Sequence, residues 1–220
     1  MVNKQKKELV IFGTGVFSEV VTEYFQEFSD YEILGYMHDT DQSIENFLNK
    51  PVFHFSEIQN FKDKFFFLAI GYKKMNSVRE KVFKKLKSEN IKFASFIHPN
   101  VKIFKTSKIG ENVFIFENNT IQPHVIISSN TIIWSGNHIG HHTVIHENVF
   151  ISSHVVIAGK CIIGKNSFLG INSSISDSTI VSDNNFIGPN TFIKSKTNSN
   201  DCYISKSTGA HKVKSNKLNF

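Results

Sequence analysis

The stretch TIIWSGNHIGHHTVIHENVFISSHVVIAGKCIIG, residues 131–164, carries an aliphatic residue at every sixth position. The same spacing runs without a change of phase from Ile97 to Ile193, and all 17 of these positions are Ile, Leu or Val. The fifth residue of most repeats is small or β-branched, as at Val149 and Cys161. A helix has a period of 3.6 residues and does not produce this pattern. A fixed short repeat indicates a solenoid of stacked units.

Six residues are enough for one short strand and one corner, so three repeats close a triangular coil. Such coils stack about 4.8 Å apart through parallel backbone hydrogen bonds. A single coil cannot bury its own inner face, and only a stack of coils gives a continuous core. The sequence therefore predicts an all-β parallel β-helix over residues 97–195.

The residues before the repeats have a different organisation. Apolar runs such as LVIFGTG (9–15) and KFFFLAIG (64–71) alternate with helical patterns such as VFSEVVTEYFQEF (16–28). Alternating strands and helices indicate a parallel sheet with helices on its faces. We predict an α/β, Rossmann-like domain over residues 1–96, and a basic C-terminal tail over residues 196–220.

Composition limits the functional classes. No run of 18 apolar residues and no signal-peptide pattern is present, so we expect a cytoplasmic protein without membrane insertion. Two cysteines without a CxxC motif argue against a disulfide framework. The net charge of +6 suits an anionic partner, either nucleic acid or a phosphorylated small molecule. We predict the small molecule and no nucleic acid.

Five of the ten histidines lie between residues 134 and 159. None of the five occupies an inward position of the repeat, and His141 and His142 fall at a corner. His141 and His146 have the spacing of two zinc ligands in hexapeptide-repeat carbonic anhydrases. The position 36 residues before His141 is Lys105, which is a poor zinc ligand at neutral pH. We expect no metal, and we keep a zinc carbonic anhydrase-like trimer and a non-catalytic scaffold as alternatives.

Motifs in both halves resemble one narrower family. They are VIFGTGVFSE (10–19), FFFLAIG (65–71), SFIHPN (95–100), IGHHTVI (139–145) and IGKNSFLGINSSI (163–175). With them the chain resembles bacterial hexapeptide-repeat acetyltransferases that modify nucleotide-linked amino sugars, or sialic acid, for surface glycans. The resemblance implies a left-handed β-helix, a homotrimer and acetyl-CoA as co-substrate.

The resemblance implies that His141 is a general base, with His142 as the fallback. The position after the base is acidic in many relatives and is His142 here, which leaves the orienting partner open between Glu147 and a backbone carbonyl. Gly159 lies one coil above His141, where the family places a glycine amide that binds the acyl carbonyl.

Further contacts are expected for the coenzyme, the substrate and the trimer. For acetyl-CoA binding we predict Phe150, Ile157, Gly159, Lys165 and Lys212. For the nucleotide-linked sugar we predict Gly13, Gly15, His38, Asp39, Gly71 and Trp134. Two outward apolar columns are predicted to be intersubunit contacts: Phe114, Ile132, Phe150, Phe168 and Phe186, and Ile126, Val144, Ile162 and Ile180.

The predicted function is N-acetylation of a nucleotide-linked amino sugar by direct transfer from acetyl-CoA. Within enzymes, the alternative is O-acetylation of a sialic acid or related sugar.

Overall fold

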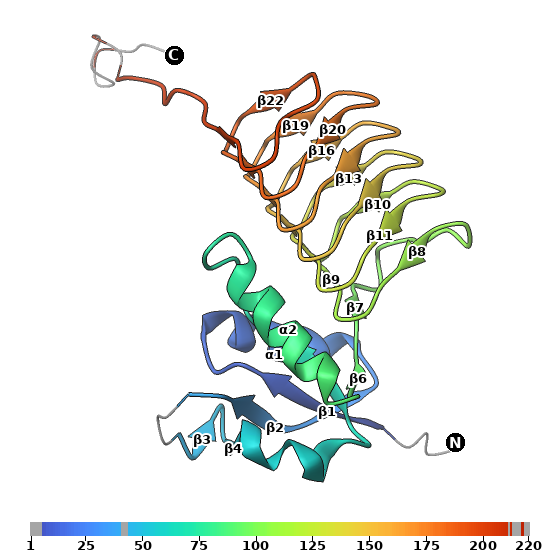
Figure 1. Cartoon of the computed structure of the whole chain (residues 1–220), viewed down its shortest axis with the longest axis vertical. Helices are drawn as coiled ribbons and strands as arrows, with labels where there is room; N and C mark the ends of the chain where they lie inside the picture. The colour runs from blue at the N-terminus through green and yellow to red at the C-terminus, as the bar shows by residue number, and fades with distance from the viewer. Residues whose placement is uncertain (1–5, 41–43, 211, 213–216, 218–220) are drawn as a thin grey trace.

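The computed structural model describes residues 6–40, 44–210, 212 and 217. They form an α/β unit and a triangular column of stacked short strands (Figure 1). The α/β unit lies against the coils that come first in the column, and the coils that come last rise away from it (Figure 1). Among the described residues, no helix has the length and apolar character needed to cross a membrane.

The α/β unit contains a six-stranded sheet in the order β3-β4-β2-β1-β5-β6. Its pairs are parallel except for β3 with β4. Its elements are β1 (Lys7–Phe12), α1 (Val16–Phe28), β2 (Tyr31–His38), β3 (Asn46–Phe47), β4 (Lys50–His54), the 3-10 helix η1 (Phe55–Phe61), β5 (Phe65–Leu68), α2 (Ser77–Ser88) and β6 (Lys92–Phe93).

The two helices cover opposite faces of this sheet. Val21 and Phe25 of α1 pack on one face together with residues of the column. Val82 and Leu86 of α2 pack on the other face. Because both faces are covered, the central strand β1 is apolar on both sides, and Val10 and Ile11 are fully buried. The predicted Rossmann-like unit is confirmed.

The column contains three parallel sheets. The first has β7 (Phe96–Ile97), β9 (Phe114–Ile115), β12 (Ile132–Ile133), β15 (Phe150–Ile151), β18 (Phe168–Leu169), β21 (Phe186–Ile187) and β23 (Cys202–Tyr203). The second has β8 (Lys108–Ile109), β11 (Ile126–Ile127), β14 (Val144–Ile145), β17 (Ile162–Ile163) and β20 (Ile180–Val181). The third has β10 (Thr120–Ile121), β13 (His138–Ile139), β16 (Val156–Ile157), β19 (Ser174–Ile175) and β22 (Phe192–Ile193).

The register matches the six-residue repeat. Ile133 pairs with Ile151, which is the residue 18 positions later in the chain, and the other coils pair in the same way. The inward aliphatic residues form one continuous core. Strand β23 pairs with β21, so the column continues into the segment expected to be only a tail.

From Asn112 to Asn190, the fourth residue of each repeat turns the corner in the left-handed conformation. Asn148 (φ 63), His142 (φ 59) and His154 (φ 59) are examples. Asparagine is the most frequent residue there because its short polar side chain tolerates this conformation. The corners place the third residue of each repeat outward, which decides where the functional side chains lie.

One edge of the column is held by a ladder of buried asparagines. The Nδ2 of Asn112 donates to Oδ1 of Asn130, and the Nδ2 of Asn130 donates to Oδ1 of Asn148, both over 2.8 Å. The backbone N–H of Leu68, at the end of β5, donates to Oδ1 of Asn112 over 2.8 Å. The α/β unit is therefore docked on this edge, which we call the asparagine edge.

Arg79 of α2 strengthens the docking. Its guanidinium is fully buried and donates to the backbone oxygens of Gly71, Asn130, Asn148 and Val149. No carboxylate of the described residues accepts from it, and desolvation lowers the pKa of Arg79 to about 9. The only arginine of the chain thus joins the two parts through backbone carbonyls.

The docking corrects one expectation about the outward apolar columns. Phe114, Ile132 and Phe150 are only 0, 1 and 4 % exposed, because the sheet they belong to is covered by the α/β unit. These three positions are therefore an intramolecular contact and not a contact between subunits. In the other column, Ile126 and Ile162 remain 37 and 36 % exposed.

Candidate functional site

One corner of the column carries three histidines, His124, His141 and His142. Here the chain passes from the third sheet to the second, as from β13 to β14. The first sheet faces the α/β unit, so this corner is the vertex of the triangle opposite that unit. We call it the histidine edge, and it consists of His124, His141, His142, Gly159, Lys160 and Asp177.

His141 lies directly against the backbone of Gly159 in the next coil. A Cβ built on Gly159 would be 2.8 Å from both Cε1 and Nε2 of His141. The backbone N–H of His141 donates to Oε1 of Gln122 over 2.8 Å. The Nε2 of an exposed imidazole is thus held beside a backbone that has no side chain of its own.

Gly159 is a glycine for a reason other than turn geometry. It is the only glycine at the third position of the repeats between residues 97 and 195, so other side chains fit this corner conformation. Within the described part of the chain, no acceptor is found for its N–H. A free N–H beside an imidazole can donate to a negatively charged oxygen.

His142 contacts His141 on the side away from Gly159. The Nδ1 atoms of the two rings are 3.1 Å apart. The ring of His142 also stacks on His124, with centroids 4.5 Å apart and planes 23° apart. Desolvation, and after it the positive charges of His124, His141 and Lys160, lower the pKa of His142.

Glu147 and Lys165 lie on a different edge from His141, which corrects the role predicted for Glu147. Both occupy the corner that follows the second sheet, next to the asparagine edge, and the N–H of Asn166 donates to the backbone oxygen of Glu147 over 3.0 Å. One whole side of the triangle separates this corner from His141. Glu147 therefore does not orient His141 within the chain. Lys165 pairs with Asp183 at 3.8 Å, and its side chain remains exposed.

The predicted coenzyme contacts of Phe150 and Ile157 are also corrected. Ile157 is fully buried inside the column, where the first residue of every repeat points. The ring of Phe150 is covered by Tyr72, at a centroid distance of 4.8 Å, and stacks on Phe168. Neither side chain is open to a ligand. Lys212 is exposed in the C-terminal segment, away from any described partner.

Trp134 belongs to the contact between the two parts of the chain. Its ring stacks on Phe116, with centroids 4.5 Å apart, and also contacts Phe17 of α1. Its Nε1 is buried and has no hydrogen-bond acceptor among the described residues. Trp134 therefore lies against the start of α1, which Gly15, another residue predicted to bind the sugar, caps.

The remaining predicted substrate residues gather at one edge of the α/β sheet. Gly13 and Gly15 follow β1, His38 and Asp39 end β2, and Gly71 follows β5, so all lie at the carboxyl ends of parallel strands. Ligands of open α/β sheets bind at such an edge. Gly13 has φ +127 and its Cβ would lie 2.9 Å from the carbonyl oxygen of Ala69, so this loop requires glycine.

His38 and Gly15 differ in their accessibility to a ligand. His38 is only 7 % exposed, and its Nδ1 is 2.9 Å from the hydroxyl of Thr40. Gly15 caps α1 and has open space where a side chain would be. A helix that begins at an unobstructed glycine offers free backbone N–H groups to an anion.

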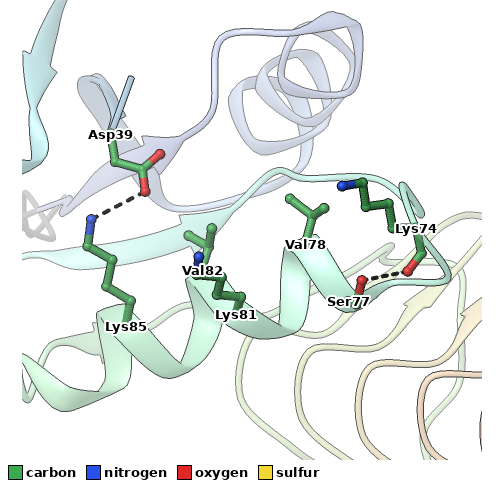
Figure 2. Close-up of a pocket in the computed structure, with 7 residues that line it drawn as sticks. All are labelled: Asp39, Lys74, Ser77, Val78, Lys81, Val82 and Lys85. Atoms are coloured by element: carbon green, nitrogen blue, oxygen red, sulfur yellow. Dashed lines mark hydrogen bonds and ion pairs between the residues drawn. The ribbon is translucent and has the colours of Figure 1, made fainter. Parts of the chain in front are cut away.

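Beside this edge lies a pocket of about 390 Å³ (Figure 2). Figure 2 shows Asp39 facing α2, where its carboxylate pairs with Lys85 at 3.3 Å. The pocket is lined by Asp39, Lys74, Ser77, Val78, Lys81, Val82 and Lys85. Three of these residues are lysines, so the pocket suits an anionic group.

The sequence analysis named Asp39 but missed the three lysines. Lys81 and Lys85 are four residues apart on one face of α2, and Lys74 lies in the turn before this helix. This spacing was the available signal. Among the described residues, no group of three or more His, Cys, Asp or Glu side chains is placed to hold a metal ion.

Comparison with known families agrees with this geometry. Residues 91–202, or 112 of the 220 residues, match the family model of the GMPPB C-terminal domain. The chain belongs to this hexapeptide-repeat family. Residues 8–86 match the PglD N-terminal domain. The column is thus a left-handed parallel β-helix, and a PglD-type domain precedes it.

Several solved structures share the fold across nearly the whole chain. The acetyltransferase domain of PglB from Neisseria gonorrhoeae FA1090 in complex with acetyl coenzyme A is 18% identical, with 90% of this chain and 95% of that chain covered and a TM-score of 0.77. PerB from Caulobacter crescentus in complex with CoA and GDP-perosamine is 19% identical, with 86% and 89% covered and a TM-score of 0.75. No curated protein matches the sequence significantly.

Proposed function

We propose that the protein transfers an acetyl group from acetyl-CoA to the amino group of a nucleotide-linked sugar. The single observation that carries the proposal is the pair formed by Nε2 of His141 and the unpaired N–H of Gly159. A base and an oxyanion donor side by side are what direct acyl transfer needs.

The reaction follows from this pair. The sugar amine attacks the thioester carbon, and a C–N bond forms while His141 removes a proton from the nitrogen. The carbonyl oxygen becomes negative and accepts a hydrogen bond from the N–H of Gly159. The C–S bond then breaks, the oxygen returns to a carbonyl, and the imidazolium can protonate the leaving thiolate.

Two features support a nucleotide-linked acceptor. The glycine loop after β1 and the open start of α1 offer N–H groups to a diphosphate. The pocket of Asp39, Lys74, Lys81 and Lys85 adds positive charge at the same end of the sheet. A structural relative, PerB, is solved with CoA and GDP-perosamine, which combines a coenzyme and a nucleotide-linked amino sugar.

The topology of one chain supports a homotrimer. The histidine edge is opposite the side that carries the α/β unit, so a sugar bound by that unit points away from its own His141. Another subunit must then supply the base. The exposed outward column with Ile126 and Ile162 offers an apolar surface for the contact.

The test is release of free CoA thiol against a panel of nucleotide-linked amino sugars, with sialic acid as a hydroxyl acceptor. We expect turnover with at least one amino sugar, and a fall of about 10²- to 10⁴-fold in the His141→Ala variant. Turnover of that variant at the wild-type rate, with the oligomer intact, would remove His141 from the mechanism.

A further inference from the structure

His141 and His142 are so close that their rings must adopt different tautomers. Their Nδ1 atoms are 3.1 Å apart, which is a hydrogen-bond distance. Such a bond requires a hydrogen on one Nδ1 and a free lone pair on the other, so both rings cannot be the same tautomer. If His142 donated, the neutral His141 would carry its hydrogen on Nε2 and have no lone pair there.

We propose that His142 is a positioning residue whose neutral ring accepts a hydrogen bond from the Nδ1–H of His141. The lone pair of His141 is then on Nε2, the atom that lies against Gly159. When His141 gains a proton on Nε2, the same bond from Nδ1–H holds the charged ring in place. This inference rests on the proposed function, because it explains how the base is oriented.

The surroundings hold His142 in this role. Its backbone is fixed in the left-handed corner conformation, with φ 59, and its N–H donates to the backbone oxygen of Pro123 over 3.2 Å. Its ring stacks on His124, which limits rotation. His142 is thereby held rigidly beside His141, where its neutral ring can accept a hydrogen bond.

The charges around His142 favour its neutral form. The groups that face it are His124 from the coil below, His141 beside it and Lys160 from the coil above, and together with desolvation they lower the pKa of His142. The carboxylate of Asp177 belongs to the same edge, with its Oδ1 3.3 Å from a Cβ built on Gly159. Protonation of His142 would put a hydrogen on both Nδ1 atoms and break the bond.

A direct test is the tautomer of each ring, measured by ¹⁵N NMR of the histidine side chains in the intact full-length protein without substrate. We expect His141 to carry its hydrogen on Nδ1 and His142 to carry its own on Nε2. In His142→Ala, the hydrogen of His141 should shift toward Nε2. The opposite assignment in the wild-type protein would overturn the proposal.

Kinetics give an independent readout. His142→Ala should lower kcat/KM by about 10- to 100-fold through a misplaced base. His154→Ala is the matched control, because His154 has the same φ of 59 at a corner away from this edge, and it should keep wild-type kcat/KM. Loss of activity in both variants, or in neither, would contradict a positioning role for His142.

The pH profile separates this role from a merely structural one. Activity needs His141 as an unprotonated base and His142 as an unprotonated acceptor. When both rings gain a proton at low pH, the acid limb of log kcat/KM should steepen from a slope of 1 toward 2. The carboxylate of His142→Glu is an acceptor that stays ionised over this acid limb. This variant should therefore be more active than His142→Ala and should show a slope of 1. A wild-type slope of 1 that this variant leaves unchanged would refute the role.

The outcomes also separate this inference from the proposed function. The expected tautomers without any acyl transfer would sink the proposed function and leave the pairing of the two histidines standing. Acyl transfer that depends on His141, with the opposite tautomers, would retain the function and refute the positioning role.

Discussion

Replacing Gly159 with Ala adds one methyl group where the ring of His141 now lies. The added Cβ would be 2.8 Å from both Cε1 and Nε2 of His141. Carbon and nitrogen atoms in ordinary contact are about 3.5 Å apart, so the ring must move by about 0.7 Å or more. The ring is the end of a flexible side chain, and it can move without a shift of the column.

The expected effects on activity and stability are therefore very different. A displacement near 1 Å in a catalytic group can cost about 10²-fold in rate, and we expect kcat/KM of Gly159→Ala to fall by about 100-fold. The backbone of residue 159 suits other residues, since every other repeat has a side chain at this position. The free energy of unfolding should change by less than about 0.5 kcal/mol.

The assay is CoA thiol release at saturating nucleotide-linked sugar, with urea unfolding of the same preparations. Gly209→Ala is the control, because a methyl group added there meets nothing within 4 Å, and it should behave like the wild-type protein. Wild-type kcat/KM in Gly159→Ala would refute the placement of the reaction beside this glycine.

Three further predictions concern the docking of the two parts of the chain. Asn130→Ala removes two hydrogen bonds of the ladder and should lower the free energy of unfolding in urea by about 2–4 kcal/mol. The control is Asn172→Ala, at a corner with φ 56 and an exposed side chain, which should cost only about 1 kcal/mol. Equal losses in the two variants would contradict the stabilising role of the ladder. Arg79→Met leaves buried carbonyls unpaired and should cost about 3 kcal/mol by the same measurement, so a loss under about 0.5 kcal/mol would exclude it from the docking. Burial acts to raise the pKa of Glu117, but hydrogen bonds that include the one from Tyr24 outweigh it and the pKa is lowered. The stabilisation from ionised Glu117 is therefore present above its unfolded-state pKa and is lost as the pH falls through its folded-state pKa. Between about pH 5 and pH 3, the free energy of unfolding should fall more for the wild-type protein than for Glu117→Gln. Parallel stability curves would refute this.

The column could be predicted in detail because its information is local and repeated. An inward aliphatic residue at each sixth position fixes the coil, and the coil in turn places Gly159 next to His141, 18 residues earlier. The hairpin of β3 with β4, and η1 after it, were not predicted, because residues 45–61 show no clear period.

The sequence could not say which side of the column the α/β unit covers. Phe114 and Ile126 are both outward apolar residues at the same position of the repeat, yet one is fully buried and the other is exposed. Long-range contacts make this difference, because aromatic side chains of α1, such as Phe25, pack on Phe114. The search for a carboxylate partner likewise led to Glu147, while the group that reaches His141 is the adjacent His142.

The most direct test of the account is a crystal structure of the protein with bound acetyl-CoA. We predict that the thioester lies at the histidine edge, with its carbonyl oxygen about 3 Å from the backbone nitrogen of Gly159 and its acyl carbon facing Nε2 of His141. A coenzyme bound at the asparagine edge or on the α/β unit, with its thioester remote from His141, would contradict it.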